Sequence, residues 1–155
     1  MDRAALAHPE HHCVSAAPSG GVPLGHGLVL AGIGGAMGAL MRWSLGTVLP
    51  VGNGFPWTTL AINVGGSALL AALPLLSLVH RRPWLPVLLG PGLLGGFTTM
   101  STFSLEAFAL ADSGRPALAG CYVAATLLGA VAAVALVERS APGGRAGVDR
   151  SEGAA

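Results

Sequence analysis

The strongest pattern in the chain is a series of long apolar runs separated by short polar segments. The runs cover residues 27–49, 57–79, 84–111 and 117–137. Each is long enough for a helix to cross a hydrocarbon core of about 30 Å. The segments between them combine Pro and Gly with Asn, Asp or Arg, as turns do. The pattern predicts an all-α integral membrane protein whose single domain, residues 27–137, has four transmembrane helices.

The third run is interrupted by a polar stretch. Residues 95–106 read GGFTTMSTFSLE, and apolar residues flank them on both sides. A straight helix of about 28 residues would be roughly 42 Å long, which exceeds a core of about 30 Å. The glycine pair and the hydroxyl run therefore predict a helix that breaks at mid-membrane. Such a break is tolerated where the freed backbone lines a cavity, an ion site or another subunit.

The two ends of the chain lack the apolar pattern. Residues 1–26 and 138–155 are rich in charged and small residues, and we expect both to be disordered tails. His8, His11 and His12 lie in the first tail without an acidic or thiol partner at metal-ligand spacing. A solvated tail is favoured there over a metal site.

Composition supports the membrane class. Charged residues make up 10% of the chain and hydrophobic residues 52%, with a mean hydropathy of +0.67. The net charge of +1 and the scattered arginines argue against nucleic-acid binding. Cys13 and Cys121 are too few for a disulfide framework or a metal site.

Arginine distribution predicts an orientation. Four spans put both termini on one side, together with the loop containing Arg81 and Arg82 and the tail containing Arg139 and Arg145. The other side carries only Arg115. By the positive-inside rule, we expect both termini in the cytoplasm of a protein of the inner (plasma) membrane.

Polar residues within the spans have alternative interpretations. Arg42 lies near a helix end, where it either snorkels to the interface or faces a water-filled vestibule. Asn63 either bonds a neighbouring helix or offers its N–H groups to an anion. Gly34 and Gly38 have the GxxxG spacing that favours close helix packing. Glu106 has no histidine or second acid near it in sequence, so we expect no enzyme activity.

Three segments together carry a resemblance to a known family. They read GGAMGALMRW at 34–43, TLAINVGGS at 59–67 and GGFTTMSTFSLE at 95–106. In these segments the chain resembles the CrcB/Fluc family of fluoride channels. The resemblance covers about residues 32–137. It implies passive export of fluoride through two pores of an antiparallel, dual-topology dimer.

The resemblance also implies roles for individual residues. The backbone carbonyls of Gly95 and Thr98 would ligate a structural sodium ion, as unwound carbonyls do. Asn63 would donate to fluoride, and Phe103 would present its positive ring edge to the ion. The remaining pathway residues implied are Ser101, Thr102, Ser104 and Glu106 and, as weaker candidates, Tyr122 and Thr126. Arg42 would lie in an anion-attracting vestibule.

Met100 departs from the family pattern. The family usually has phenylalanine at this position, and a thioether offers no ring edge although it fills the space. The arginine bias is also unexpected for a subunit that inserts in both orientations. A homodimer and a heterodimer with an oppositely oriented paralogue therefore remain alternatives.

Two other functions are alternatives to a fluoride channel. A small helical membrane scaffold or assembly subunit would use Asn63, the glycines and the hydroxyl run for packing only. A four-helix multidrug exporter would require a proton-coupling residue in the first span, whereas Glu106 lies in the third. The fluoride channel is the favoured prediction.

Overall fold

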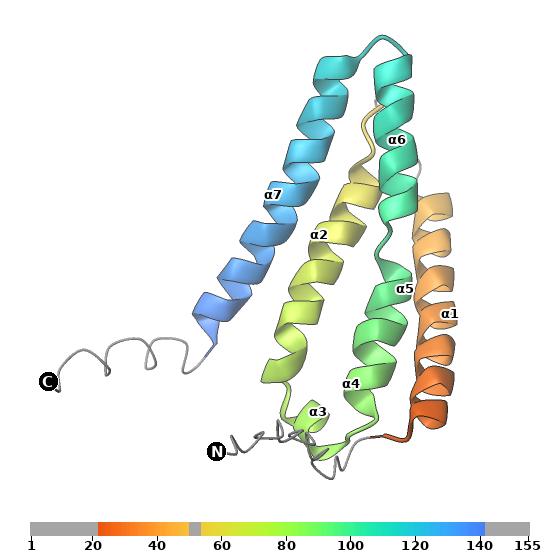
Figure 1. Ribbon diagram of the computed structural model, residues 1–155. Helices are drawn as coiled ribbons and strands as arrows, with labels where there is room; N and C mark the ends of the chain where they lie inside the picture. The colour runs from red at the N-terminus through yellow and green to blue at the C-terminus, as the bar shows by residue number, and fades with distance from the viewer. Residues whose placement is uncertain (1–21, 50–53, 142–155) are drawn as a thin grey trace, which may run out of the picture.

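The computed structural model describes residues 22–49 and 54–141, and every element in them is helical. The elements are α1 (Leu24–Val48), α2 (Trp57–Ala72), η1 (Leu73–Leu75), α3 (Ser77–Arg81), α4 (Leu85–Val87), η2 (Leu88–Leu94), α5 (Gly95–Phe97), α6 (Met100–Asp112) and α7 (Pro116–Ser140). Figure 1 shows α1, α2 and α7 running lengthwise, with α4, α5 and α6 stacked end to end in a fourth column. In that column η2 and α5 pack on α1, while α6 packs on α7.

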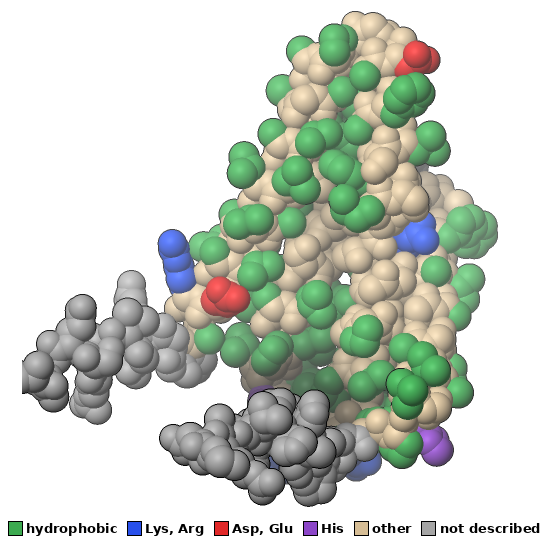
Figure 2. Space-filling view, in the orientation of Figure 1, with side chains coloured by type: hydrophobic (Ala, Val, Ile, Leu, Met, Phe, Trp, Pro, Cys, Tyr) green, Lys and Arg blue, Asp and Glu red, His purple; other side chains and the backbone are tan. Residues whose placement is uncertain are grey.

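Three helical stretches are long and apolar enough to cross a membrane. Within the described residues these are Leu24–Val48, Trp57–Leu75 and Pro116–Ser140. Many of their large apolar side chains are exposed, Leu28 and Leu128 among them, as expected for surfaces that face lipid. Figure 2 shows hydrophobic side chains along the length of the visible face. The prediction of an all-helical protein compatible with a membrane is confirmed.

The predicted third span is not one continuous helix. It consists of α4, η2 and α5, then two extended residues, then α6. Thr98 has ψ 155° and Thr99 has φ −148° and ψ 122°, both outside the helical region. The predicted interruption is therefore present, but it lies at Thr98 and Thr99, whereas Gly95 and Gly96 are themselves helical.

The first half of this column has a widened helical turn. η2 is a π-helix, and the N–H at its C-terminal cap, Gly95, donates to the Gly90 carbonyl five residues earlier. Pro91 lies inside it. Proline has no N–H and its ring clashes with the carbonyl four residues earlier in an α-helix, so a wider turn accommodates it.

Helix ends differ from the predicted spans by a few residues. The second helix ends early, because Pro74 cannot continue α2, and the chain passes through η1 to the separate helix α3. α1 begins at Leu24, inside the predicted tail, and α7 extends to Ser140. The rest of the predicted tails, at 1–21 and 142–155, lies outside the described residues.

Glycines on α1 bring it into contact with η2 and α5. A Cβ at Gly34 would collide with the Leu88 carbonyl, and a Cβ at Gly38 would collide with the Leu93 carbonyl. From the other side, a Cβ at Gly96 would collide with the Gly35 carbonyl. The GxxxG spacing thus serves packing within one chain, which confirms the packing interpretation.

Candidate functional site

An amide pair between Asn63 and Thr99 closes the helix break. The Asn63 Nδ2 donates to the Thr99 carbonyl at 2.9 Å, and the Thr99 N–H donates to Asn63 Oδ1 at 2.8 Å. Both residues are buried. The side chain of α2 therefore replaces the backbone partners that an unbroken helix would have supplied. Of the two Asn63 N–H donors, one is used here, and the described residues supply no acceptor for the other.

The break frees two backbone carbonyls. In an unbroken helix Thr99 N–H would donate to the Gly95 carbonyl, but it donates to Asn63 instead. Likewise Thr102 N–H would donate to the Thr98 carbonyl, but it donates to Thr99 Oγ1 at 3.2 Å as an N-cap bond. Within the described residues, the Gly95 and Thr98 carbonyls thus receive neither of these helical bonds. They are hard oxygen donors of the kind that alkali and alkaline-earth cations prefer.

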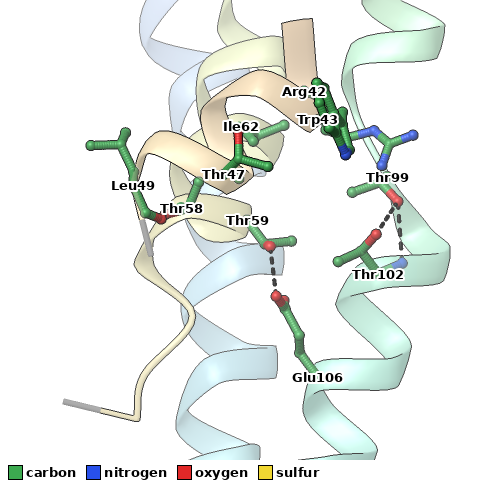
Figure 3. A pocket seen from close by; sticks show the side chains of 11 residues that line it. Arg42, Trp43, Thr47, Leu49, Thr58, Thr59, Ile62, Thr99, Thr102 and Glu106 are labelled. Carbon is green, nitrogen blue, oxygen red and sulfur yellow. Dashed lines mark hydrogen bonds between the residues drawn. The ribbon is translucent and has the colours of Figure 1, made fainter. Parts of the chain in front are cut away.

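The carboxylate of Glu106 is held at both oxygens. The Thr59 hydroxyl donates to Oε1 at 2.9 Å, and the Tyr122 hydroxyl donates to Oε2 at 2.8 Å. These donors come from α2 and α7, while Glu106 belongs to α6. Figure 3 shows the Thr59 hydroxyl pointing at the carboxylate. The helices α2, α6 and α7 therefore meet at one hydrogen-bonded carboxylate, which lies one helical turn after Thr102 in α6.

Aromatic rings pack beside this carboxylate. Phe103 is buried with its centroid 5.2 Å from that of Tyr122, and the planes are inclined by 48°. Tyr122 has no exposed surface, and a second ring, Phe55, lies 5.6 Å away in an edge-to-face arrangement. Thr126, one turn further along α7, is also buried and donates to the Tyr122 carbonyl at 2.8 Å.

A cavity opens above the break. Its volume is ≈ 290 Å³; most of its wall is apolar, and its polar residues are Arg42, Thr47, Thr58, Thr59, Thr99, Thr102 and Glu106. Figure 3 shows these side chains around the space, with Arg42 and Glu106 on opposite sides. Arg42 Nε donates to the Gly96 carbonyl at 3.4 Å. Arg42 therefore lines the cavity and contacts the end of α5.

A second, larger groove lies on the other side of the same pair. It has a volume of ≈ 520 Å³, and Asn63, Ser67, Thr98, Thr99 and Thr126 contribute hydroxyl or amide groups to walls that are otherwise mostly apolar. Thr99 borders both the groove and the cavity. The Asn63–Thr99 pair thus separates two hollows that approach the break from opposite sides.

Some predicted site residues are not brought together within one chain. Met100, Ser101 and Ser104 are exposed on the outer side of α6, and Gly95 is exposed beside the groove. Met100 and Gly95 border the groove, whereas Ser101 and Ser104 line neither hollow. The Ser101 hydroxyl lies 3.2 Å from that of Thr99, within hydrogen-bond distance.

Two participating residues were not among the predicted site residues. Thr59 bonds Glu106, and Thr99 supplies both backbone groups of the central pair. Thr59 lies four residues before Asn63, so helical periodicity places both on one face of α2. That spacing was the available signal for Thr59, whereas the role of Thr99 depends on where the helix breaks.

The family model described as CrcB-like protein, Camphor Resistance (CrcB), matches residues 29–137, most of the chain. The chain belongs to the CrcB family. The match begins within α1 and ends within α7, and it includes every residue of the two hollows, so the site described above is part of the CrcB domain.

Curated relatives of this CrcB protein carry a functional name. A fluoride-specific ion channel FluC of Erythrobacter litoralis is 40% identical over 112 residues, which are 66% of this chain and 82% of the relative. A fluoride-specific ion channel FluC 2 of Bacillus subtilis is 45% identical over 100 residues, covering 64% and 75% of the two chains. A FluC 2 of Nocardia farcinica is 41% identical over 128 residues, covering 77% and 89%.

Proposed function

We propose that this CrcB protein is a fluoride-selective ion channel of the inner membrane, which lowers cytoplasmic fluoride by passive export. The observation that carries the proposal is the Asn63–Thr99 pair at a broken helix, with a hollow on each side, in a chain related to named fluoride channels. A channel makes and breaks no covalent bonds, so the protein is not an enzyme.

The chemistry of the hollows suits a small hard anion. Asn63 offers its second N–H at the groove. The hydroxyls of Ser67, Thr98 and Thr126 also border the groove, but each donates its proton to the backbone carbonyl four residues earlier. Phe103, which lines neither hollow, would offer the positive edge of its ring. Neither Asn63 nor Phe103 carries a full positive charge, so both would stabilise fluoride without trapping it. The positive charge of Arg42 raises the local concentration of anions in the ≈ 290 Å³ cavity that it lines.

The broken column serves as a fourth membrane crossing. Its elements, α4, η2, α5 and α6, follow one another in a column that runs lengthwise beside the three continuous helices (Figure 1). Four crossings return the chain to the side where it began. The Asn63–Thr99 pair supports the backbone at the break, which lipid would not do.

The freed carbonyls fit a structural sodium ion. Gly95 and Thr98 would hold it through their carbonyl oxygens, at the carbonyl end of the half-helix formed by η2 and α5. A bound cation would fix the two halves of the broken column relative to each other. Two carbonyls alone leave such an ion largely unligated, so a second copy of the break would complete the site.

A dimer accounts for the uncovered polar surface. Gly95, Met100, Ser101 and Ser104 are exposed in one chain, and an antiparallel partner laid across the break would cover them. Met100 and the arginine bias leave two versions of this dimer. One is a homodimer, and the other is a heterodimer with an oppositely oriented paralogue that supplies the missing ring.

A scaffold without transport activity is the second candidate, because the same amide pair also serves packing. Phe103→Leu distinguishes the two candidates, since it removes a ring edge and keeps an apolar side chain. A channel predicts loss of fluoride efflux from liposomes with the dimer retained in size-exclusion chromatography. Loss of assembly alone, in a chain whose wild type transports no fluoride, would favour the scaffold.

A further inference from the structure

Phe55 lies in the connection before α2, outside the hollows, and it contacts the residue that bonds Glu106. Its ring centroid lies 5.6 Å from that of Tyr122, and the two planes are inclined by 85°. The ring centroid of Trp57 lies 4.4 Å from that of Phe55. The rings of Trp57, Phe55, Tyr122 and Phe103 thus form one continuous series from the start of α2 to α6.

The backbone around Phe55 is fixed at several points. Gly54 has φ +71°, which favours glycine, and its carbonyl accepts a bond from Arg115 Nη1 at 3.4 Å. The Trp57 N–H donates to the Phe55 carbonyl at 2.9 Å, and Pro56 is buried. Arg115 belongs to the connection between α6 and α7. The segment that carries Phe55 is therefore attached to the far end of the α6–α7 hairpin.

Tyr122 depends on its neighbours for its position. Its ring is fully enclosed between Phe103 and Phe55, and its hydroxyl donates to Glu106 at 2.8 Å. The backbone of α7 fixes only where the side chain begins. Without Phe55, one side of the ring would lose its contact, and the hydroxyl would be free to leave the carboxylate.

We propose that Phe55 is a positioning residue of the fluoride pathway, which acts by holding the Tyr122 hydroxyl on Glu106. The inference rests on the proposed function. Arg115 and Gly54 fix the segment that carries Phe55, and Phe55 fixes the ring of Tyr122. The Tyr122 hydroxyl in turn holds the Glu106 carboxylate, which borders the ≈ 290 Å³ cavity. Phe55 itself touches neither the cavity nor the groove.

A double-mutant cycle on fluoride efflux tests whether Phe55 acts through the Tyr122 hydroxyl. Phe55→Leu should slow efflux about tenfold, which corresponds to one aromatic contact. Phe55→Tyr keeps the ring and should restore the wild-type rate. In a Tyr122→Phe background, which lacks the hydroxyl, Phe55→Leu should have almost no further effect. An equal tenfold loss in both backgrounds, or efflux of Phe55→Leu at the wild-type rate, would overturn the proposal.

Tyr122 also supplies a direct signal, because it is the only tyrosine of the chain. With tyrosine labelled at Cζ with carbon-13, Phe55→Leu should move the resonance toward its position in Glu106→Gln, where the charged acceptor is gone. An unchanged resonance in Phe55→Leu would contradict the proposal even if efflux falls. Absence of fluoride efflux from the wild type, both alone and co-reconstituted with a paralogue, would instead refute the proposed function, which separates the two failures.

Discussion

Thr99 is the residue through which the two halves of the site are connected. Its backbone N–H and carbonyl both bond Asn63, and its hydroxyl accepts the N–H of Thr102. It also borders both hollows. Thr99 therefore lies between the half-helix that ends with α5 and the helix α6, and it caps the N-terminus of α6. A change at its partner Asn63 should affect both fold and transport.

Asn63→Ala should abolish fluoride efflux and destabilise the protein by about 2 kcal/mol, because two buried backbone groups of Thr99 lose their partner. Thermal melting in detergent measures the second effect. Ser67→Ala is the matched control for stability, because the Ser67 hydroxyl bonds only the Asn63 carbonyl of its own helix. Equal melting temperatures for Asn63→Ala and wild type would show that the pair does not support the break.

Residue roles were predictable where one polar group stands alone in an apolar run. Asn63 and Glu106 stand out in this way. Thr59 does not, because threonine hydroxyls inside helices commonly bond their own backbone, as Thr126 does. Only the three-dimensional meeting of α2, α6 and α7 shows that the Thr59 hydroxyl bonds Glu106.

At the scale of elements, the first helix supports the broken column. Gly34, Gly35 and Gly38 allow α1 to approach η2 and α5 until backbone meets backbone. Arg42, one turn further along, bonds the last turn of α5. α1 thus fixes the half of the column formed by η2 and α5. α2 and α7 fix the other half, α6, through Glu106.

Gly38→Ala should destabilise the folded protein, because the new methyl group would collide with the Leu93 carbonyl and α1 would have to move away. Gly32→Ala is the matched control on the same helix, since a Cβ there meets nothing within 4 Å. It should be neutral or stabilising by up to about 1 kcal/mol, from helix propensity alone. A melting temperature of Gly38→Ala at or above that of Gly32→Ala would contradict this packing.

The elements were more predictable than their ends. Apolar run length predicted four spans, and the described residues contain three helices long and apolar enough to cross a membrane together with one interrupted column. The interruption lies at Thr98 and Thr99, beyond the glycine pair, where Gly96 packs against Gly35 of α1 within the helix and the Thr99 N–H and hydroxyl find partners outside the helical pattern. Such partners come from other helices, so the local sequence does not specify the point of the break.

At the scale of the whole molecule, one chain carries only part of the proposed site. Gly95, Met100, Ser101 and Ser104 are exposed in the single chain, and Thr98 is partly exposed. Burying this surface against a second subunit would convert an uncovered polar face into the inside of an assembly. Met100 is exposed on this surface, so a homodimer would carry methionine there in both copies, whereas a paralogue would be free to supply a ring.

Met100→Phe should raise fluoride efflux per dimer when the chain is reconstituted alone, because it adds a ring edge to each pore. Met37→Phe is the control, an exposed methionine of α1 that borders neither hollow. A rise in both variants, or in neither, would show that a ring at position 100 is not what a homodimer lacks.

The most direct test of the central claim is anion efflux from liposomes that contain this chain alone. Vesicles loaded with fluoride are compared with vesicles loaded with chloride, and efflux is recorded with ion-selective electrodes. The account predicts rapid fluoride efflux with little chloride efflux, and its loss in Asn63→Ala. Equal efflux of both anions, or no fluoride efflux even when a paralogue is co-reconstituted, would contradict a fluoride-selective channel.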